Sequence, residues 1–231
     1  MKTIGLIGGM SWESSLEYYR IINEFVRDTL GGLHAAKIVL YSFDFAEIAA
    51  LHEEEDWDAA AKLLIAAAQR LEQAGADVLA ICTNTMHKVA DPVQKNVRIP
   101  LLHIVDATAQ EIKTRGLKKV GLLGTKFTME QDFYKKKLTD PHGLEVIIPA
   151  EDERNVVNHV IYDELCCGQI KPSSKEQFYT IMRNLVASGA EGIILGCTEI
   201  DLLVDQQDIE IPLFDTTTIH AKAVARFALQ Q

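Results

Sequence analysis

The residues best suited to chemistry are a thiol and a hydroxyl, each directly after an apolar run. Cys197 follows residues 193–196, and Thr83 follows residues 79–82. A cysteine thiolate can take up and return a proton, because its ordinary pKa of about 8.5 is moved by its surroundings. Hydroxyls and amides beside it can bind carboxylate oxygens. The pattern therefore predicts acid/base chemistry on a small ligand.

Both reactive positions stand at the same place in an internal repeat. The helix exit Ala74-Gly75-Ala76-Asp77 precedes the first apolar run, and Ser188-Gly189-Ala190-Glu191 precedes the second. Superposing the two exits aligns Cys197 with Thr83, an offset of 114 (197 − 83). The same superposition aligns Cys82 with Gly196.

Three other segments repeat at nearly the same offset. Residues 2–8 match 118–124 (offset 116), residues 18–19 match 133–134 (offset 115), and residues 99–101 match 211–213 (offset 112). A period this long predicts two related domains and not an array of short repeats.

Strands and helices are predicted to alternate along the chain, which is typical of an α/β protein with parallel sheets. Strands are expected at 3–8, 37–43, 77–82, 100–104, 119–123, 144–148, 191–195 and 211–214. Helices are expected around Tyr18–Phe25 with a stop at Gly31, and at 57–74, 106–115, 128–138, 152–166, 173–187 (capped by Ser173 or Ser174) and 217–229. We expect one domain to comprise 1–100 plus 210–231, and the other 101–209.

Bulk composition limits the partners. The 231 residues are 48% hydrophobic and 24% charged, which is ordinary for a soluble globular protein. The net charge of −10 argues against nucleic acid or an anionic membrane as a partner. The N-terminus has no signal-peptide layout and no apolar run approaches membrane-spanning length, so we expect a cytoplasmic protein. The four cysteines form no C-x-x-C pair, so we expect no metal site.

Ligands of open parallel sheets bind beyond the carboxyl ends of the strands. These ends carry residues 9–11, 83–85, 124–125 and 197–199. Two domains facing each other would bring Thr83 and Cys197 to one ligand from opposite sides. Racemisation needs two acid/base groups flanking one carbon, so we expect an active site at the domain interface. The side chains expected to bind carboxylate oxygens are Asn84, Thr85, Thr125 and Thr198.

The remaining cysteines and histidines are interpreted as structural. Cys166 and Cys167 lie at a predicted helix end, and Cys82 lies inside a predicted strand, where free cysteines usually pack. The histidines are scattered along the chain and read as structural or surface residues: His87, His103, His159 and His220.

The chain resembles the cofactor-independent aspartate/glutamate racemase family over nearly its full length. Three segments carry the resemblance: residues 4–14, Ile81-Cys82-Thr83-Asn84-Thr85-Met86-His87, and Ile194-Leu195-Gly196-Cys197-Thr198-Glu199. The resemblance implies two pseudo-symmetric Rossmann-like (flavodoxin-like) domains, an acidic amino acid as substrate, no pyridoxal phosphate, no metal, and a homodimer. It also implies two cysteines that act as paired acid and base.

This sequence departs from the family pattern at the first of those cysteines. The typical motif is Cys-Asn-Thr, but here Thr83 precedes Asn84 and the thiol lies one place earlier, at Cys82. Because successive strand side chains point to opposite faces, Cys82 and Thr83 cannot both face the substrate along a regular strand. The repeat favours Thr83. We therefore expect an asymmetric Thr83/Cys197 acid/base pair that favours reaction of the L-enantiomer.

Substrate-binding positions carried over from the resemblance are Met10 and Ser11 in the first loop, Thr128, and Lys171 for the side-chain carboxylate. The sequence shows no clear counterpart of the arginine that assists this lysine in some aspartate racemases, and His52 is considered as its substitute.

Two other functions stay open. A single-cysteine decarboxylase or isomerase of the same superfamily would tolerate loss of the first thiol, and a non-catalytic binder of small acids would need no Cys197.

Overall fold

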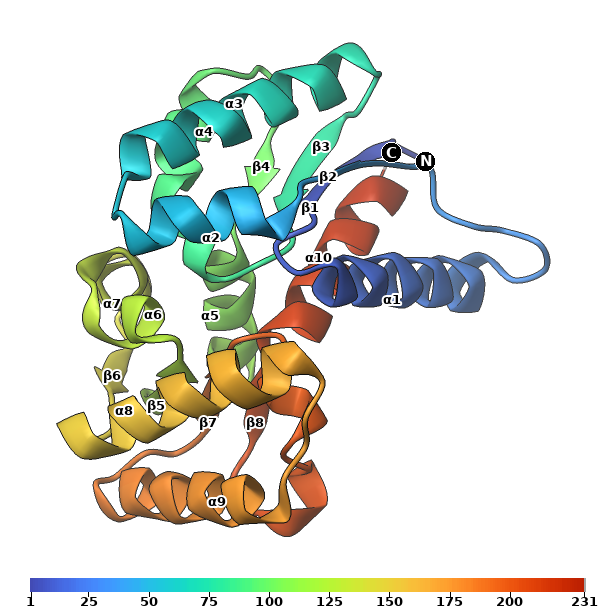
Figure 1. Cartoon of the computed structure of the whole chain (residues 1–231). Helices are drawn as coiled ribbons and strands as arrows, with labels where there is room; N and C mark the ends of the chain where they lie inside the picture. Colours follow the sequence, from blue (N-terminus) through green and yellow to red (C-terminus); the bar gives the residue numbers. More distant parts are fainter. Residues whose placement is uncertain (231) are drawn as a thin grey trace. The chain divides into compact units, whose positions relative to one another are not determined.

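The computed structural model describes residues 1–230 (Figure 1). It divides into two compact units. Unit 1 comprises Met1–Ile104 and the segment from Thr217 onward, and unit 2 comprises Val105–Thr216. The two termini lie side by side in unit 1, where the Lys2 amide donates to the carbonyl of Ala228 at 2.8 Å.

Unit 1 contains four parallel strands and the helices that cover them. In chain order its elements are β1 (Ile4–Gly8), α1 (Trp12–Leu30), β2 (Ile38–Ser42), α2 (Phe45–Glu53), α3 (Trp57–Gln73), β3 (Val78–Ile81), the 3₁₀ helix η1 (Thr85–Val89), α4 (Ala90–Lys95) and β4 (Leu101–Leu102). Helix α5 (Ile104–Thr114) leads out of the unit, and α10 (Thr216–Leu229) leads back into it.

Unit 2 repeats this plan. Its elements are β5 (Lys119–Gly124), α6 (Lys126–Glu130), α7 (Asp132–Thr139), β6 (Glu145–Ile147), α8 (Glu151–His159), the π-helical η2 (Val160–Glu164), the 3₁₀ helix η3 (Leu165–Cys167), α9 (Pro172–Ala187), β7 (Ile193–Gly196), the 3₁₀ helices η4 (Ile200–Leu202) and η5 (Gln206–Asp208), and β8 (Leu213–Asp215).

The two sheets have the same topology and register. The strand order is β2-β1-β3-β4 in unit 1 and β6-β5-β7-β8 in unit 2, and all pairs are parallel. Gly5 pairs with Leu79 in the first sheet, and Gly121 pairs with Ile193 in the second. The differences are 116 (121 − 5) and 114 (193 − 79), the offsets of the sequence repeat. The predicted α/β fold with two pseudo-symmetric parallel sheets is confirmed.

A glycine in the first strand of each unit lets a helix pack closely on the sheet. A Cβ on Gly5 would lie 2.8 Å from Leu79 and 3.2 Å from Leu71 of α3. A Cβ on Gly121 would lie 2.6 Å from Ile193 and 3.0 Å from Leu185 of α9. Any larger side chain would force these leucines out of their positions, so the same contact fixes one helix of each unit against its sheet.

An acidic residue anchors the first strand in both units. The Asp77 carboxylate accepts from the Thr3 amide at 2.6 Å, and Glu191 accepts from the amides of Lys118 and Lys119 at 2.6 and 3.0 Å. Asp77 and Glu191 also occupy equivalent positions in the repeat (191 − 77 = 114). These bonds satisfy backbone donors at the start of each first strand.

Alternating side chains of β3, and of Cys82 directly after it, divide between two cores. Ile81 packs with α3 and α4, and Cys82 packs with residues of α1 and α10 on the opposite face. Both are fully buried. Thr83 is the first residue beyond them that keeps partial exposure.

Three predicted helices differ from the structure. The helix expected at 128–138 is two helices, α6 and α7, because Gln131 adopts an extended backbone between them. The helix expected at 152–166 stays α-helical only to His159 and continues as η2 and η3. The third, expected to be capped by Ser173 or Ser174, begins after Lys171 with Pro172 in its first turn, a position that tolerates the missing amide hydrogen of proline.

Helix α2 was not predicted. Its N-cap is Asp44, whose carboxylate accepts from the Ala46 amide at 3.1 Å. The helix buries only Ile48 and His52, so its apolar periodicity is weak and local patterning does not reveal it. None of the helices within residues 1–230 combines the length and apolarity needed to cross a membrane.

Three histidines that are scattered in the sequence meet in unit 1. The His87 ring lies 4.5 Å from the His103 ring and 5.7 Å from the His220 ring. His220 Nε2 lies 2.9 Å from the Leu102 carbonyl, and its Nδ1 lies 2.7 Å from the Tyr18 hydroxyl. Since a carbonyl only accepts, Nε2 carries the proton and Nδ1 accepts from Tyr18. Burial lowers the pKa of His220 from 6.5 to about 4.

We predict that His220 makes the protein less stable in mild acid. Between pH 6.5 and about 4 the unfolded state binds a proton at this position and the folded state does not. The free energy of unfolding should therefore fall by up to about 1.4 kcal/mol per pH unit across this window through His220 alone. Above pH 6.5 this contribution is constant.

Urea unfolding at a series of pH values measures this effect. His220→Gln should flatten the pH dependence between pH 6.5 and 4, whereas His34→Gln, which alters an exposed histidine of the same unit, should not. Equal slopes in wild type and His220→Gln would contradict the assignment of a neutral buried ring.

Candidate active site

In unit 2 the thiol of Cys197 lies one residue beyond the end of β7. Cys197 Sγ donates to Glu199 Oε2 at 3.0 Å, and Thr198 Oγ1 donates to the same oxygen at 2.6 Å. The Cys197 carbonyl accepts from the Ile200 amide at 3.2 Å, which begins η4. Glu199 is buried, and Cys197 is half-buried. The motif Cys-Thr-Glu therefore forms one compact hydrogen-bonded turn.

The surroundings of Cys197 favour its protonated form. Burial raises the pKa of the thiol well above its ordinary value, and the charge of Glu199 raises it further. The thiol is consequently protonated at neutral pH and already directed at a carboxylate oxygen. Any reaction that needs the thiolate must supply a compensating positive charge or a proton acceptor.

An irregular helical segment packs beside this turn. Tyr162 of η2 and Cys166 of η3 pack against the same apolar cluster as Cys197. Burial raises the pKa of the Tyr162 phenol, and so do Cys197, Cys166 and Glu199. Tyr162 thus stays a neutral phenol beside the thiol. Single-turn π segments are frequent at functional sites, because the extra residue redirects the side chains that follow.

A second polar turn in unit 2 follows β5. Thr125 caps α6: its Oγ1 accepts from the Thr128 amide at 3.3 Å and lies 3.2 Å from Thr128 Oγ1. Both threonines are buried. The hydroxyls of Thr125 and Thr128, which the sequence assigned to substrate binding, are therefore brought together at one helix N-terminus.

In unit 1 the equivalent turn carries Thr83. The carbonyl of Cys82 accepts from Ser14 Oγ at 2.5 Å, and the carbonyl of Thr83 lies 2.7 Å from His87 Nδ1. Asn84 and Thr85 are buried in the turn that begins η1. Burial raises the pKa of the Cys82 thiol, which has no exposed surface. Cys82 is thus an inert core residue in this structure, and Thr83 keeps partial exposure.

The first loop of unit 1 is held by the start of α1. Ser11 caps the helix by accepting from the Ser14 amide at 3.3 Å, and Ser15 Oγ accepts from the Gly9 amide at 2.8 Å. Met10 is buried in a core cluster, so its side chain fills the interior and only its backbone is left for a ligand. Ser11 is half-buried.

His52 does not provide the cation that the sequence interpretation assigned to it. Its Nε2 lies 2.9 Å from Met86 Sδ, and its ring stacks on Trp57 at 5.2 Å. Burial lowers the pKa of His52, and the neighbouring Lys88 lowers it further, so the ring is neutral at physiological pH. The positive charge nearby belongs to Lys88, whose Nζ lies 3.7 Å from the centre of the Trp57 ring.

Lys171, the predicted partner of a substrate carboxylate, already pairs with a protein carboxylate. Its Nζ lies 3.2 Å from Glu164 Oε1, while Ser174 Oγ donates to Glu164 Oε2 at 2.5 Å. The Ser174 hydrogen bond lowers the pKa of Glu164, and the Lys171 hydrogen bond lowers it further. The Lys171 side chain is 48% exposed, so it remains able to turn toward a second anion.

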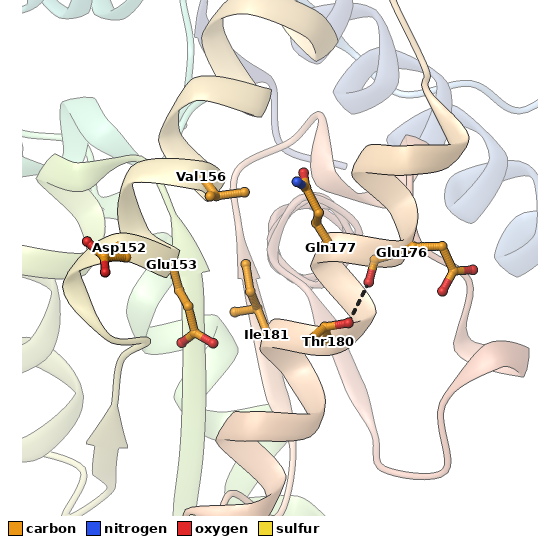
Figure 2. A pocket seen from close by; sticks show the side chains of 7 residues that line it. All are labelled: Asp152, Glu153, Val156, Glu176, Gln177, Thr180 and Ile181. Carbon is orange, nitrogen blue, oxygen red and sulfur yellow. Dashed lines mark hydrogen bonds between the residues drawn. The ribbon is translucent and has the colours of Figure 1, made fainter.

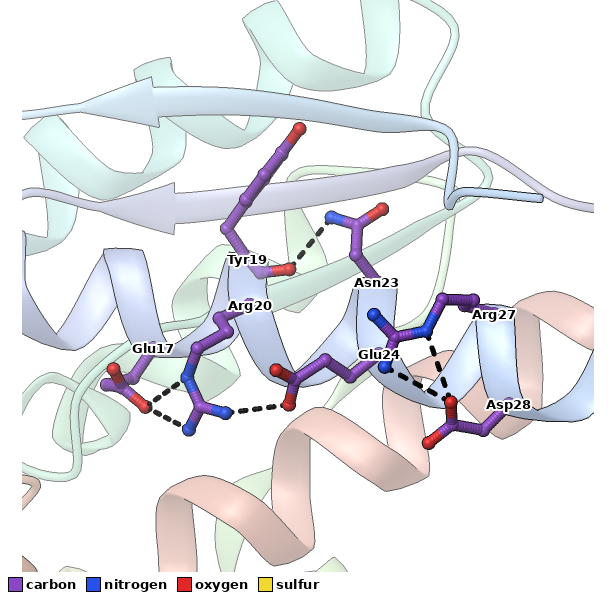
Figure 3. Close-up of polar contacts among 7 residues, drawn as sticks. All are labelled: Glu17, Tyr19, Arg20, Asn23, Glu24, Arg27 and Asp28. Atoms are coloured by element: carbon purple, nitrogen blue, oxygen red, sulfur yellow. Dashed lines mark hydrogen bonds and ion pairs between the residues drawn. The ribbon is translucent and has the colours of Figure 1, made fainter. Parts of the chain in front are cut away.

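Two other charged surfaces are poorly suited to an acidic ligand. A groove between α8 and α9 is lined by Asp152, Glu153 and Glu176, and it contains none of the predicted site residues (Figure 2). On α1, Arg20 is bound by both Glu17 and Glu24 at 2.6 Å, so two carboxylates outweigh its positive charge (Figure 3).

Comparison with known proteins identifies the family. The Asp/Glu/hydantoin racemase family profile matches residues 7–224. The chain belongs to the Asp/Glu/hydantoin racemase family.

Relatives with solved structures share the whole fold. A Yersinia pestis protein provisionally described as an Asp/Glu racemase is 56% identical, with a TM-score of 0.95 and full coverage of both chains. An aspartate racemase homologue from Pyrococcus horikoshii is 41% identical, with a TM-score of 0.87 and full coverage of both chains. The broad-specificity amino-acid racemase RacX of Bacillus subtilis is 26% identical over 95% of each chain.

Two residues that contribute to the Cys197 and Thr83 turns of this racemase-family chain were not predicted from the sequence to have a role there. Glu199 was noted in the motif but given no role, although a carboxylate two residues after a cysteine is within reach of it. His87 was considered structural because nothing in its spacing reveals that its ring binds the Thr83 carbonyl. Lys88, five residues after Thr83, was also overlooked as a local positive charge.

We predict that Glu199→Gln lowers the pKa of the Cys197 thiol. The neutral amide removes the negative charge that disfavours the thiolate, so the thiolate forms at lower pH than in wild type. Iodoacetamide alkylation followed by peptide mass spectrometry measures the pH midpoint for Cys197 separately from the other cysteines. Glu176→Gln removes an exposed carboxylate of the same unit and should leave the midpoint unchanged. An unchanged or higher midpoint in Glu199→Gln would contradict the prediction.

Proposed function

We propose that this protein is a cofactor-independent racemase of acidic amino acids, aspartate or glutamate, that acts by abstracting the Cα proton. One observation carries the proposal: a half-buried thiol at a strand end is hydrogen-bonded to a carboxylate in a chain of the Asp/Glu/hydantoin racemase family. A thiol that only filled the core would have no need of a charged acceptor. A homodimer, which the family resemblance implies, is part of the proposal.

In the proposed reaction Cys197, as thiolate, takes the Cα proton of the L-enantiomer. The thiol must first lose its own proton, which Glu199 or water accepts. The ammonium group of a bound amino acid would favour this loss, because a nearby positive charge stabilises the thiolate. The electron pair left on Cα delocalises into the substrate carboxylate. Hydroxyl donors, of which Thr125 and Thr198 are candidates, would stabilise the charge that develops on its oxygens.

Thr83 completes the inversion by donating its hydroxyl proton to the opposite face of the same carbon. Water then returns a proton to Thr83, and the Cys197 thiol releases the proton it gained. A hydroxyl is a far weaker base than a thiolate, so the D-enantiomer is deprotonated more slowly than the L-enantiomer. The equilibrium constant between enantiomers is one, so slow deprotonation of the D-enantiomer means that inversion is slow in the opposite direction as well. The carbanion formed from L-substrate therefore seldom receives a proton on the face that gives the D-enantiomer. Solvent exchange of L-substrate therefore outruns its inversion.

Recognition of the substrate carboxylates is assigned to local groups, because the net charge of −10 offers no favourable overall field. Lys171 is proposed to bind the side-chain carboxylate of the substrate, either by breaking its ion pair with Glu164 or by binding both carboxylates at once. The backbone at Met10, with Ser11, Asn84, Thr85 and Thr128, is proposed to bind the α-carboxylate. The assignments to the α-carboxylate are supported by the position of those residues in the segments that follow the carboxyl ends of β1, β3 and β5, whereas Lys171 precedes α9 and is proposed for its charge.

We predict that Cys197→Ser abolishes exchange of the Cα hydrogen of L-aspartate and L-glutamate in deuterium oxide. Removing a positioned general base costs about 100- to 10,000-fold. Proton NMR of the Cα–H signal measures the rate. Cys166→Ser alters a half-buried thiol of the same unit and should leave exchange within a few-fold of wild type. Wild-type exchange rates in Cys197→Ser would refute the role of this thiol.

We predict that Thr83→Cys accelerates inversion and activity on the D-enantiomer by about 100-fold, since a thiol replaces a hydroxyl as the second acid/base group. Chiral chromatography of product from each enantiomer measures this gain. Cys82→Ala removes the neighbouring buried thiol and should leave the L/D ratio unchanged. If Cys82→Ala, and not Thr83→Ala, slows the D-side reaction, Cys82 is the partner and our assignment of Thr83 is wrong.

A decarboxylase or isomerase acting on a small carboxylic acid is the second candidate. The burial of Cys82 favours it, because only one thiol is then left for a two-sided acid/base pair. Carbon dioxide release from a dicarboxylic acid, without Cα exchange of aspartate or glutamate, would support this function over racemisation.

A further inference from the structure

His87 has a single protonation state that its two hydrogen bonds dictate. Its Nδ1 lies 2.7 Å from the Thr83 carbonyl, and its Nε2 lies 3.2 Å from the Ile104 amide. A carbonyl can only accept and a backbone amide can only donate. The ring must therefore carry its proton on Nδ1 and an unshared pair on Nε2. A protonated ring would lose the bond to Ile104.

The surroundings of His87 are consistent with this neutral form. The residue is buried, with 3% of its surface exposed. Burial lowers the pKa of His87 well below 6.5, and the neighbouring His103 and His220 lower it further. At neutral pH the ring is thus a fixed donor on one side and a fixed acceptor on the other.

The bond to His87 acts on the backbone of Thr83. The Cys82 carbonyl belongs to the peptide plane before Thr83, and Ser14 Oγ holds it at 2.5 Å. The Thr83 carbonyl belongs to the peptide plane after it, and His87 holds it. Because a peptide unit is planar, fixing both planes fixes φ and ψ of Thr83. The direction of its Cα–Cβ bond is then set as well.

The sheet does not provide this restraint. The β3 ladder to β1 ends at the pair Ile7–Ile81, with one further bond from the Cys82 amide to the Ile7 carbonyl at 2.9 Å. In unit 2 the equivalent carbonyl, that of Cys197, is bound by the Ile200 amide. Unit 1 thus uses a side chain where unit 2 uses the backbone.

We propose that His87, as its Nδ1–H tautomer, is a positioning residue that fixes the direction of the Thr83 Cα–Cβ bond, which carries the hydroxyl, with Ser14 as the second restraint. The inference rests on the proposed function, in which Thr83 donates a proton to the face of Cα that gives the D-enantiomer. His87 itself touches neither substrate nor reacting atoms.

Two substitutions distinguish the hydrogen bond that the ring donates to Thr83 from the one it accepts from Ile104. The amide nitrogen of Asn lies close to where Nδ1 of histidine lies, and the amide oxygen of Gln reaches close to the position of Nε2. His87→Asn can therefore still donate to Thr83, whereas His87→Gln can only accept from Ile104. His220→Gln is the matched control, because His220 is buried in the same cluster but binds Leu102 and Tyr18.

The measurement is the ratio of inversion to Cα exchange of L-substrate, in wild type and in the Thr83→Cys background where inversion is faster. His87→Gln and Ser14→Ala should each lower this ratio about 10-fold, since misplacing a reacting group by about 1 Å costs up to about 100-fold, while L-exchange stays within about 3-fold. His87→Asn and His220→Gln should keep the wild-type ratio. If all four variants lower both rates equally, His87 only stabilises the fold and the proposal is wrong.

A second readout does not depend on activity. In protein labelled with ¹⁵N-histidine, long-range proton–nitrogen NMR spectra at pH 7 should show His87, identified by its loss in His87→Asn, with a protonated Nδ1 and an unprotonated Nε2. The Nε2–H tautomer would overturn the inference even in an active enzyme. Conversely, absence of exchange in wild type with the Nδ1–H tautomer present would refute the proposed function and leave the backbone restraint established.

Discussion

The position of every reactive group follows from sheets that are covered by helices on both faces. Alternate side chains of such strands enter one core or the other, as Ile81 and Cys82 do. Beyond the strand ends, polar or ionisable side chains can retain exposure, as Thr83 and Cys197 do. In unit 2 Gly196 stands where Cys82 stands in unit 1, and a Cβ there would lie 2.8 Å from the Leu123 carbonyl. The thiol of unit 2 therefore lies one residue later, where it retains exposure.

Being outside the core does not by itself make the thiol of Cys197 a base. The sequence predicts a cysteine whose pKa depends on its surroundings, and in the structure burial and the charge of Glu199 both keep it protonated. The same carboxylate oxygen accepts from Thr198, so one carboxylate binds both side chains that precede it. For the proposed reaction this means that binding of a cationic group would favour ionisation. An amino acid brings such a group in its ammonium, whereas a simple dicarboxylic acid does not, which favours racemisation over decarboxylation.

Hydrophobic periodicity and internal repetition were sufficient to predict the sheets. Periodicity can be read within one segment, and repetition can be read by comparing two segments of the same sequence. The offsets near 114–116 recur as paired residues in the two ladders and as the leucines that pack on Gly5 and Gly121. The interruptions of the predicted helices at Gln131 and after His159 were not predictable, because no proline or glycine stands at either position to indicate the end of a helix. Contacts such as Ser14 with the Cys82 carbonyl join residues 68 positions apart, and no spacing rule reveals them.

The two units share a scaffold but restrain their reactive turns by different means. In unit 2 a backbone amide binds the Cys197 carbonyl, and this bond would form with almost any side chain at position 200. In unit 1 the restraint is the imidazole of His87, which also depends on Ile104 and on its own tautomer. In the proposed acid/base pair, the hydroxyl of Thr83 is a weaker group than the thiol of Cys197. The more elaborate restraint therefore accompanies the weaker of the two groups.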